Sequence, residues 1–209
     1  DDVRTLAEYR AGEIQLESLK LLPGTEMRRR AEELGICYSP LPPYEVLQTR
    51  EITPDELQTA RQLSRLLDGF YNASAWQEIT RRLIVEEPDF LTRFLDHLIQ
   101  IGVIDQPMGL ERRGILLYHF CKEHYPHFLT AMSRAWIEAG MSLKKEPAER
   151  VRTKHVTPPE AWTVCTGTYR DDLRLCKLPA PEEGRCYWYG FETESQQLRP
   201  VFAAVSEYI

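Results

Sequence analysis

With 209 residues, the chain is long enough to bury one large core or two smaller ones, and its 43% hydrophobic and 28% charged residues are typical of globular proteins. A net charge of −6 argues against a general nucleic-acid-binding protein, and no apolar run approaches the ~20 residues that a membrane helix needs. The polar start DDVRTLAEYR is not a signal peptide, and five widely spread cysteines favour reduced thiols in a cytoplasm.

The first part of the chain is predicted to contain a strand between two helical pieces. Residues 1–10 are typical of a helix end, and the apolar spacing of Ile14–Leu22 predicts a strand that Pro23–Gly24 ends. Thr25 is placed to cap a short helix that stops at Gly35. Three pairs in this helix lie four residues apart and favour a self-paired, solvated face over an anion site: Glu26/Arg30, Arg28/Glu32 and Arg29/Glu33.

A helical domain is predicted from Thr53 to about Gly140. Three prolines keep Cys37–Thr53 extended or turning, and Thr53 with Glu56 then forms a capping box that has Pro54 at the first helical position. Further helix starts are predicted at a second capping box, Ser74 with Gln77, and at Pro88, followed by helices over Leu110–Tyr125 and Phe128–Gly140.

The last part of the chain changes in composition. Lys144–His155 is a charged connector with some helix, and four short strands are predicted after it: Trp162–Tyr169, Leu173–Leu178, Arg185–Phe191 and Val201–Val205. The predicted fold class is therefore mainly α, of α+β type, with a small antiparallel β-rich tail. Three parts are expected, with boundaries at 1–52, 53–143 and 144–209.

Three motifs in order carry a resemblance to a known family: LKLLPGT at 19–25, PPYEVL at 42–47, and a helix ending in FYN at 70–72. They resemble the last β/α unit of the barrel in cobalamin-binding radical S-adenosylmethionine (radical SAM) proteins, and the C-terminal domain of unassigned function that follows it. One departure is Glu17, where relatives tend to have a small residue. The resemblance covers Ile14–Asn72 best.

The resemblance implies that this chain is a fragment, as does its Asp-Asp start without methionine. Neither the Cys-x3-Cys-x2-Cys loop of a radical SAM cluster nor the Asp-x-His-x-x-Gly motif of cobalamin-binding domains is present. A 4Fe-4S cluster, S-adenosylmethionine and cobalamin are therefore expected only in the full-length protein. The expected partners are the upstream barrel of the same polypeptide and an unknown substrate, with no nucleic acid and no membrane.

Gln15 and Glu17 are the candidate binding residues. In the predicted strand they share one face, and barrel strands point alternate side chains into the lumen where radical SAM enzymes bind their ligands. The alternative places both side chains in solvent near the strand end. No catalytic residue is predicted in the fragment.

Two groups of metal-ligating side chains remain open. Cys165, Cys176 and Cys186 lie on predicted strands that could bring three thiolates together for an auxiliary cluster, although cysteine is also commonly buried without metal. The run from His119 to His127 places Cys121 and His124 three residues apart, but a partly buried aromatic face explains it as well.

Two functions follow. The chain either caps the barrel or shapes the substrate pocket of a cobalamin-dependent radical SAM enzyme, or it is a stand-alone helical interaction module without catalysis. The module predicts that Ile14–Leu22 pairs within the chain, whereas the enzyme fragment predicts an exposed strand edge.

Overall fold

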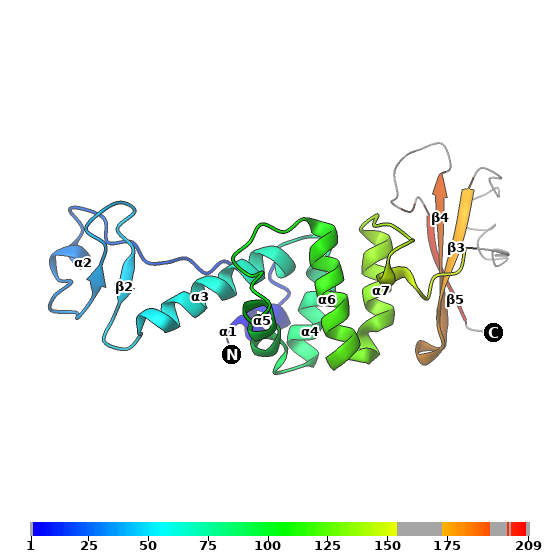
Figure 1. The fold of residues 1–209 in the computed structure, drawn as a ribbon, viewed down its shortest axis with the longest axis horizontal. Helices are drawn as coiled ribbons and strands as arrows, with labels where there is room; N and C mark the ends of the chain where they lie inside the picture. The colour runs from blue at the N-terminus through cyan, green and yellow to red at the C-terminus, as the bar shows by residue number, and fades with distance from the viewer. Residues whose placement is uncertain (1, 154–172, 193–199, 201, 208–209) are drawn as a thin grey trace. The chain divides into compact units, whose positions relative to one another are not determined.

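The computed structural model describes residues 2–153, 173–192, 200 and 202–207 (Figure 1). Over these residues the chain forms seven α-helices and two small antiparallel sheets, which confirms the predicted α+β class. It divides into two compact units, Asp1–Pro107 and Met108–Ile209. This division falls inside the range 53–143, so the three-part organisation stays a prediction. Among the described residues, no helix has the length and apolar character that crossing a membrane requires.

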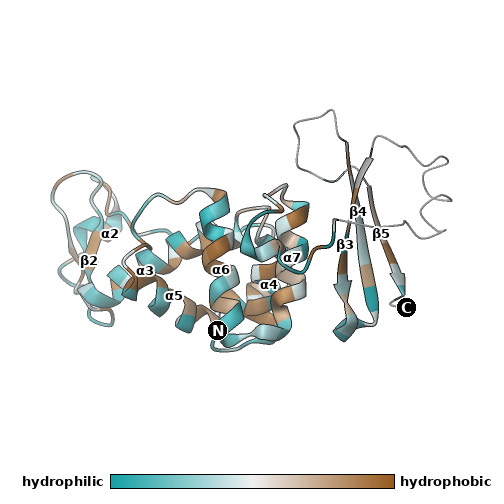
Figure 2. Cartoon of the chain, turned by 45° about the vertical axis from the view of Figure 1, so that its right-hand side comes forward, coloured by the Kyte–Doolittle hydropathy of each residue, from teal (hydrophilic) through white to brown (hydrophobic). Residues whose placement is uncertain are grey.

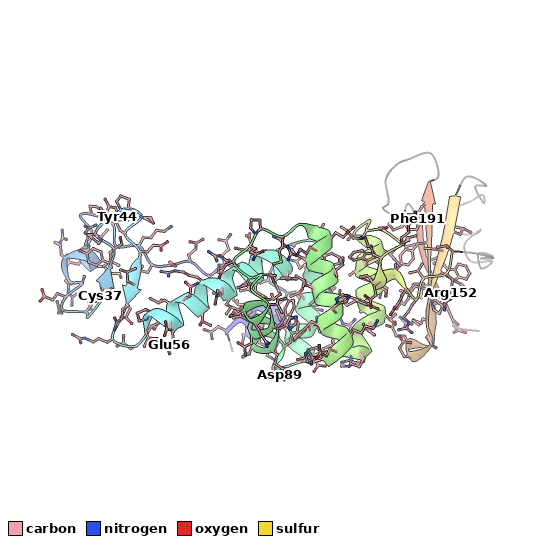
Figure 3. The ribbon with its side chains drawn as sticks, in the orientation of Figure 1. Cys37, Tyr44, Glu56, Asp89, Arg152 and Phe191 are labelled. Atoms are coloured by element: carbon pink, nitrogen blue, oxygen red, sulfur yellow. The ribbon has the colours of Figure 1, made fainter. Side chains whose placement is uncertain are left out.

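The first unit contains five helices and a two-stranded sheet. Its elements are α1 (Asp2–Glu8), α2 (Glu26–Arg29), β1 (Cys37–Tyr38), β2 (Val46–Gln48), α3 (Pro54–Leu66), the π-helical turn η1 (Leu67–Tyr71), α4 (Gln77–Glu86) and α5 (Phe90–Gln100). α2, β1 and β2 form a small lobe whose core is Leu21, Ala31 and Val46. Figure 3 shows Cys37 and Tyr44 in this lobe and Glu56 at the start of α3.

The capping box at the start of α3 is confirmed. The Thr53 hydroxyl accepts a hydrogen bond from the Glu56 amide at 3.3 Å, and the Glu56 carboxylate accepts one from the Thr53 amide at 2.8 Å. The Thr53 amide, and next the Thr53 hydroxyl, donate to the Glu56 carboxylate and lower the pKa of Glu56. The apolar face of α3 is unevenly packed, because Leu67 and Phe70 beyond its end are buried while Leu57 is half-buried and Ala60 is exposed. Figure 2 shows hydrophilic and hydrophobic segments together along α3.

The helical core of the first unit is aromatic. The Phe70 ring meets the edge of Phe94 at 5.0 Å between centroids, and Phe90 stacks on Phe94 at 5.4 Å. Ile79 and Leu83 of α4 are buried, as is Trp76 at its N-cap position. Ile101 lies outside this core with 43% of its surface exposed, because α5 ends one residue before it.

Two local predictions in the first unit are wrong. Ser74 and Gln77 form no capping box, since α4 begins at Gln77 and its N-cap residue, Trp76, makes no side-chain cap. Ile14–Leu22 is not a regular strand either. Only Lys20 forms a bridge, antiparallel to Glu45, because a strand needs a partner along its length and the described residues supply one only there.

The second unit packs a sheet against a helix pair. Its elements are α6 (Leu110–His124), the 3₁₀ turn η2 (Pro126–Phe128), α7 (Leu129–Glu138), the 3₁₀ turn η3 (Glu146–Ala148), β3 (Leu173–Ala180), the 3₁₀ turn η4 (Pro181–Glu183), β4 (Arg185–Glu192) and β5 (Phe202–Glu207). The strand order is β3-β4-β5, antiparallel throughout, as predicted. The first predicted strand of this region, Trp162–Tyr169, lies outside the described residues.

Strand alternation gives the sheet two apolar faces. One face carries Cys176, Leu178, Tyr187, Tyr189 and Phe191, which form a buried cluster with Ile137 of α7. The opposite face carries a second cluster of Leu175, Cys186 and Trp188. Polar contacts reinforce the first face: the Tyr189 hydroxyl donates to Glu138 at 3.2 Å, and Arg150 donates to Glu182 at 3.1 and 3.2 Å.

Candidate functional site

An extended strap of residues 11–22 spans the first unit and is fixed at two anchors. It is the blue trace that runs past α3 to the small lobe in Figure 1. Its regular secondary structure is limited to the bridge at Lys20. The strap contains both predicted binding residues, Gln15 and Glu17, so its anchoring decides what they face.

The first anchor is made by side chains that follow α3. The Tyr71 hydroxyl donates to the Ala11 carbonyl at 2.7 Å, and the side-chain amide of Gln77 donates to the Gly12 carbonyl at 2.7 Å. The side-chain amide of Asn72 bonds both backbone groups of Ile14. Its oxygen accepts from the Ile14 N–H and its nitrogen donates to the Ile14 C=O, each at 2.9 Å. An asparagine amide used in this way imitates a neighbouring strand, and it fixes the strap at Ile14.

The second anchor is a short backbone ladder in the small lobe. The Leu21 amide donates to the Tyr44 carbonyl, and the Val46 amide donates to the Leu19 carbonyl, both at 2.9 Å. Arg28 supports this ladder, because it donates to the Leu21 carbonyl at 3.0 Å. Its guanidinium also lies 5.0 and 4.7 Å from the ring centroids of the two tyrosines beside it, Tyr38 and Tyr44.

The arginines of α2 do not pair as predicted. Arg29 and Arg30 pair with carboxylates three residues away, Glu26 and Glu33, at 2.6 and 2.7 Å. The Arg30 hydrogen bond lowers the pKa of Glu33. Arg29 and Arg30 therefore do pair with carboxylates of their own segment, but with different partners from those predicted. The predicted pairs lie four residues apart, and α2 ends at Arg29, too early to place them side by side. Arg28 instead holds the strap.

Between the anchors the strap presents unpaired backbone. Within the part of the chain that the structure describes, the N–H and C=O groups of Gln15–Ser18 make no hydrogen bond. In an extended chain, successive residues direct these groups to opposite edges. The backbone groups of these four consecutive residues are therefore unpaired along both edges of the strap within the described residues.

A groove of about 690 Å³ opens where the strap diverges from β2 and passes α3. Its apolar surface comes from Leu16, Leu19, Val46, Ile52, Leu57 and Ala60. Its polar rim contains Glu17, Glu45, Arg61 and Arg65. Arg61 lies 3.5 Å from Glu45, and Arg65 pairs with Asp105. Glu17 has no partner among the described residues, so one negative charge of the rim is uncompensated.

The structure separates the two predicted binding residues. Both are exposed, but only Glu17 lines the groove, while the Gln15 side chain donates to Glu13 at 2.6 Å. The groove holds no nucleophile beside a general base. Its combination of apolar floor, charged rim and unpaired backbone is suited to binding.

Of the tail cysteines, the two that the structure describes, Cys176 and Cys186, are not brought together. Cys176 and Cys186 belong to the two clusters on opposite faces of the sheet, and burial raises the pKa of Cys186. Cys165 lies outside the described residues. Two thiols that point to opposite faces of one sheet do not ligate one ion, so Cys176 and Cys186 do not form a shared site.

The His119–His127 run likewise forms no metal site among the described residues, where no group of three potential ligands was found. His119 and Lys122 instead contact Glu146 at 2.8 and 2.7 Å, and the hydrogen bond from Lys122, followed by that from His119, lowers the pKa of Glu146. His124 packs on the Phe120 ring at 4.6 Å.

Sequence reasoning did not predict a role for the residues of the first anchor, Tyr71, Asn72 and Gln77. Their signal was the motif FYN, which was noted for its resemblance and not for a role. The three motifs that carry the resemblance supply this one system: FYN the first anchor, LKLLPGT the strap side of the second anchor, and PPYEVL its partner strand.

The fold and groove define an α+β protein with an anchored extended strap and a binding groove. Residues 32–134 match the sequence model of a family described as "Protein of unknown function (DUF4080)". The match begins after α2, ends within α7 and includes one wall of the groove. No curated protein and no solved structure matches the chain.

Proposed function

We propose that the chain is the C-terminal portion of a cobalamin-binding radical SAM enzyme, in which its first unit closes the barrel and shapes the substrate pocket. The family matched by residues 32–134 is known as a C-terminal domain of such proteins, which supports the proposal. The motifs at 19–25, 42–47 and 70–72 support it further, because they build one positioning system instead of three unrelated contacts.

The observation that carries the proposal is the edge of the strap formed by the unpaired backbone of Leu16 and Ser18. Leu16 and Ser18 present unpaired N–H and C=O groups two residues apart, which is the spacing at which a neighbouring strand bonds. Leu19 and Leu22, with 48% and 51% of their surface exposed, lie beside this edge. An exposed, extended and partly apolar edge is a template for strand addition. In the proposed enzyme, the upstream barrel supplies that strand.

The chain's own cysteines do not fit the cluster of a radical SAM enzyme, because none of them has the Cys-x3-Cys-x2-Cys spacing. The cluster, S-adenosylmethionine and cobalamin belong to the upstream part in this proposal. There they supply radical generation or radical methyl transfer. The role of this chain is positional: Tyr71, Asn72 and Arg28 hold the strap extended so that it completes the barrel.

The alternative is a stand-alone helical interaction module, which the open groove favours. That alternative predicted pairing of Ile14–Leu22 within the chain, and among the described residues such pairing is limited to the bridge at Lys20. The unpaired edge therefore favours the enzyme portion over the module.

Hydrogen exchange tests the proposal. The Leu16 and Ser18 amides are expected to exchange rapidly in the 209-residue chain, and at least about 100-fold more slowly in the protein extended upstream, because a ladder bond protects an amide until it opens. The Val46 amide, which donates to the Leu19 carbonyl in the second anchor, serves as a reference. Equal exchange of Leu16 and Ser18 in both proteins would overturn barrel completion by the strap.

A further inference from the structure

Strand β5 is the open edge of the three-stranded sheet in the second unit. The strand order β3-β4-β5 puts it at the end of the sheet, where β4 is its one neighbour among the described residues (Figure 1). In the described part of the chain, no backbone group of Phe202–Glu207 bonds outside the ladder with β4. Every second residue of an antiparallel ladder directs its N–H and C=O groups away from the neighbour. β5 therefore presents a row of unpaired backbone groups.

The opposite edge of the sheet is protected, whereas β5 is not. Lys177 of β3 bonds both of its backbone groups to Arg152, at 2.7 and 2.9 Å, and Pro179 has no N–H to offer a further strand. A lysine, a proline and a covering segment are devices by which edge strands avoid pairing with another chain. The stretch Ala203–Ser206 of β5 contains neither a lysine nor a proline.

The apolar face of the sheet continues onto β5 and is bare there. Tyr187 and Tyr189 of β4 are buried in the cluster with Ile137, while the residues opposite them in the ladder, Val205 and Ala203, are exposed. Residues that are opposite each other in a ladder lie on the same face. Val205 has 54% of its surface exposed. An apolar face that ends in an open edge is suited to extension of the sheet by one more strand.

The charges along β5 identify a strand that fits. Glu207 is the one charged residue of Phe202–Glu207, and it lies opposite the cation Arg185 of β4. An antiparallel copy of β5 centred on Val205 places Val205 opposite its own copy and Glu207 opposite Ala203, so that no like charges meet. A parallel copy would align the two Glu207 carboxylates, which is unfavourable. The edge is therefore complementary to itself about a twofold axis.

From these observations we propose that β5 pairs in antiparallel orientation with β5 of a second copy of this chain. The pairing joins two three-stranded sheets into one sheet of six strands. The twofold axis passes near Val205, and the exposed side chain of Val205 packs against its copy on the same face. This inference is independent of the proposed enzyme, because it uses only the second unit.

Sedimentation velocity of the 209-residue chain tests the proposal. Two six-residue strands form a small interface, so we expect a weak, reversible dimer whose fraction rises with concentration up to about 1 mM. A chain that remains monomeric at this concentration would overturn the proposal.

Hydrogen exchange shows whether β5 is the contact in the dimer. Every second amide of Ala203–Glu207 should exchange at least about threefold more slowly in a concentrated sample than in a dilute one, because a ladder bond protects an amide. The Tyr187 and Tyr189 amides lie in the central strand at both concentrations and serve as the reference. A dimer whose β5 amides exchange equally in both samples would place the contact elsewhere and refute the pairing.

Matched variants test the centre of the contact. Val205→Lys sets two lysines opposite each other and should weaken dimerisation about tenfold or more, because like charges directly opposite destabilise a strand pair. Ile101→Lys makes the same kind of change at a residue of the first unit that is 43% exposed, and its effect should stay below about twofold. Equal effects of the two changes would contradict the assignment. Because the Trp188 indole donates to the Ser206 hydroxyl at 2.9 Å, tryptophan fluorescence checks that β5 stays paired with β4 in Val205→Lys.

Discussion

At the scale of single residues, Asn72 fixes one end of the strap. Its amide makes two bonds to the backbone of Ile14 and a third to Asp68 at 3.0 Å. Each neutral hydrogen bond contributes about 1 kcal/mol to stability, and more is lost when a buried partner is left unsatisfied. Removing the amide therefore frees one end of the strap.

Asn72→Ala is expected to destabilise the first unit by about 1–3 kcal/mol, because two backbone groups of Ile14 lose their partner. Hydrogen exchange at the Ile14 amide should accelerate well beyond that of amides in α5. Asn72→Asp is the control, since it keeps the acceptor for the Ile14 amide and should protect that amide better than alanine does. Unchanged exchange at Ile14 in Asn72→Ala would contradict the anchoring role.

Cysteine reactivity is a second property of individual residues. Cys37 is exposed, while Cys121 is completely buried and burial raises its pKa to about 12. Because the thiolate is the reactive species, alkylation at pH 8 should modify Cys37 first and leave Cys121 intact until the chain unfolds. Peptide mapping by mass spectrometry after timed iodoacetamide treatment measures this order. Early labelling of Cys121 would show that α6 is not packed as described.

At the scale of elements, the predicted capping boxes at Thr53 and Ser74 show when a local sequence pattern is enough to predict a helix cap. Both follow the same sequence rule, but only Thr53 makes its bond. Ser74 makes no cap because the chain turns before Gln77, whose side chain reaches back to Gly12 at 2.7 Å. A local pattern carries no information about a partner 65 residues away, so the long-range bond at Gln77 could not be predicted from sequence.

Thr53→Ala is expected to cost about 1 kcal/mol, the usual value of an N-cap, whereas Ser74→Ala should change stability by less than about 0.5 kcal/mol. Exchange of the amides in the first turns of α3 and α4 measures the two effects separately. Destabilisation by Ser74→Ala equal to that by Thr53→Ala would mean that Ser74 caps α4 after all.

The strap illustrates the other limit of sequence reasoning. The alternation in Ile14–Leu22 correctly indicated an extended conformation, and the predicted helices over 53–140 formed because capping residues and apolar stripes are local signals. A ladder is a property of two segments, however, and pairing reached only Lys20. The prediction that Gln15 and Glu17 line a barrel lumen stays a prediction; in this chain Glu17 lines the groove and Gln15 donates to Glu13.

Contacts between the sheet and the helices of the second unit should respond to acid. Burial alone would raise the pKa of Glu182, but hydrogen bonds from Thr130 and Arg150 outweigh it and lower that pKa. A carboxyl whose folded pKa is lowered stabilises the fold above its unfolded pKa, and this contribution is lost as pH falls through the folded value. Glu182 therefore supports sheet packing at neutral pH and ceases to do so in acid, below about pH 4.

Glu182→Gln should lower stability at pH 7 and reduce the difference in stability between pH 7 and pH 3. Urea unfolding followed by tryptophan fluorescence at both pH values measures this, and Glu123→Gln, an exposed carboxylate on α6, serves as the control. An identical pH dependence in wild type and Glu182→Gln would rule out the contribution of this carboxylate.

At the scale of the whole molecule, the described residues of the first unit form a positioning system around the strap. The strap, its two anchors and the groove account for all three motifs of the resemblance. The match over residues 32–134 covers the partner strand of the second anchor and the FYN residues of the first.

The most direct test of the account is to read the coding DNA several hundred codons upstream of Asp1. We predict an open reading frame, continuous with this chain, that encodes an Asp-x-His-x-x-Gly motif followed by a Cys-x3-Cys-x2-Cys loop. An initiator codon immediately before Asp1 would contradict the account, since the strap would then have no barrel to complete, and the groove would be the site that remains to be explained.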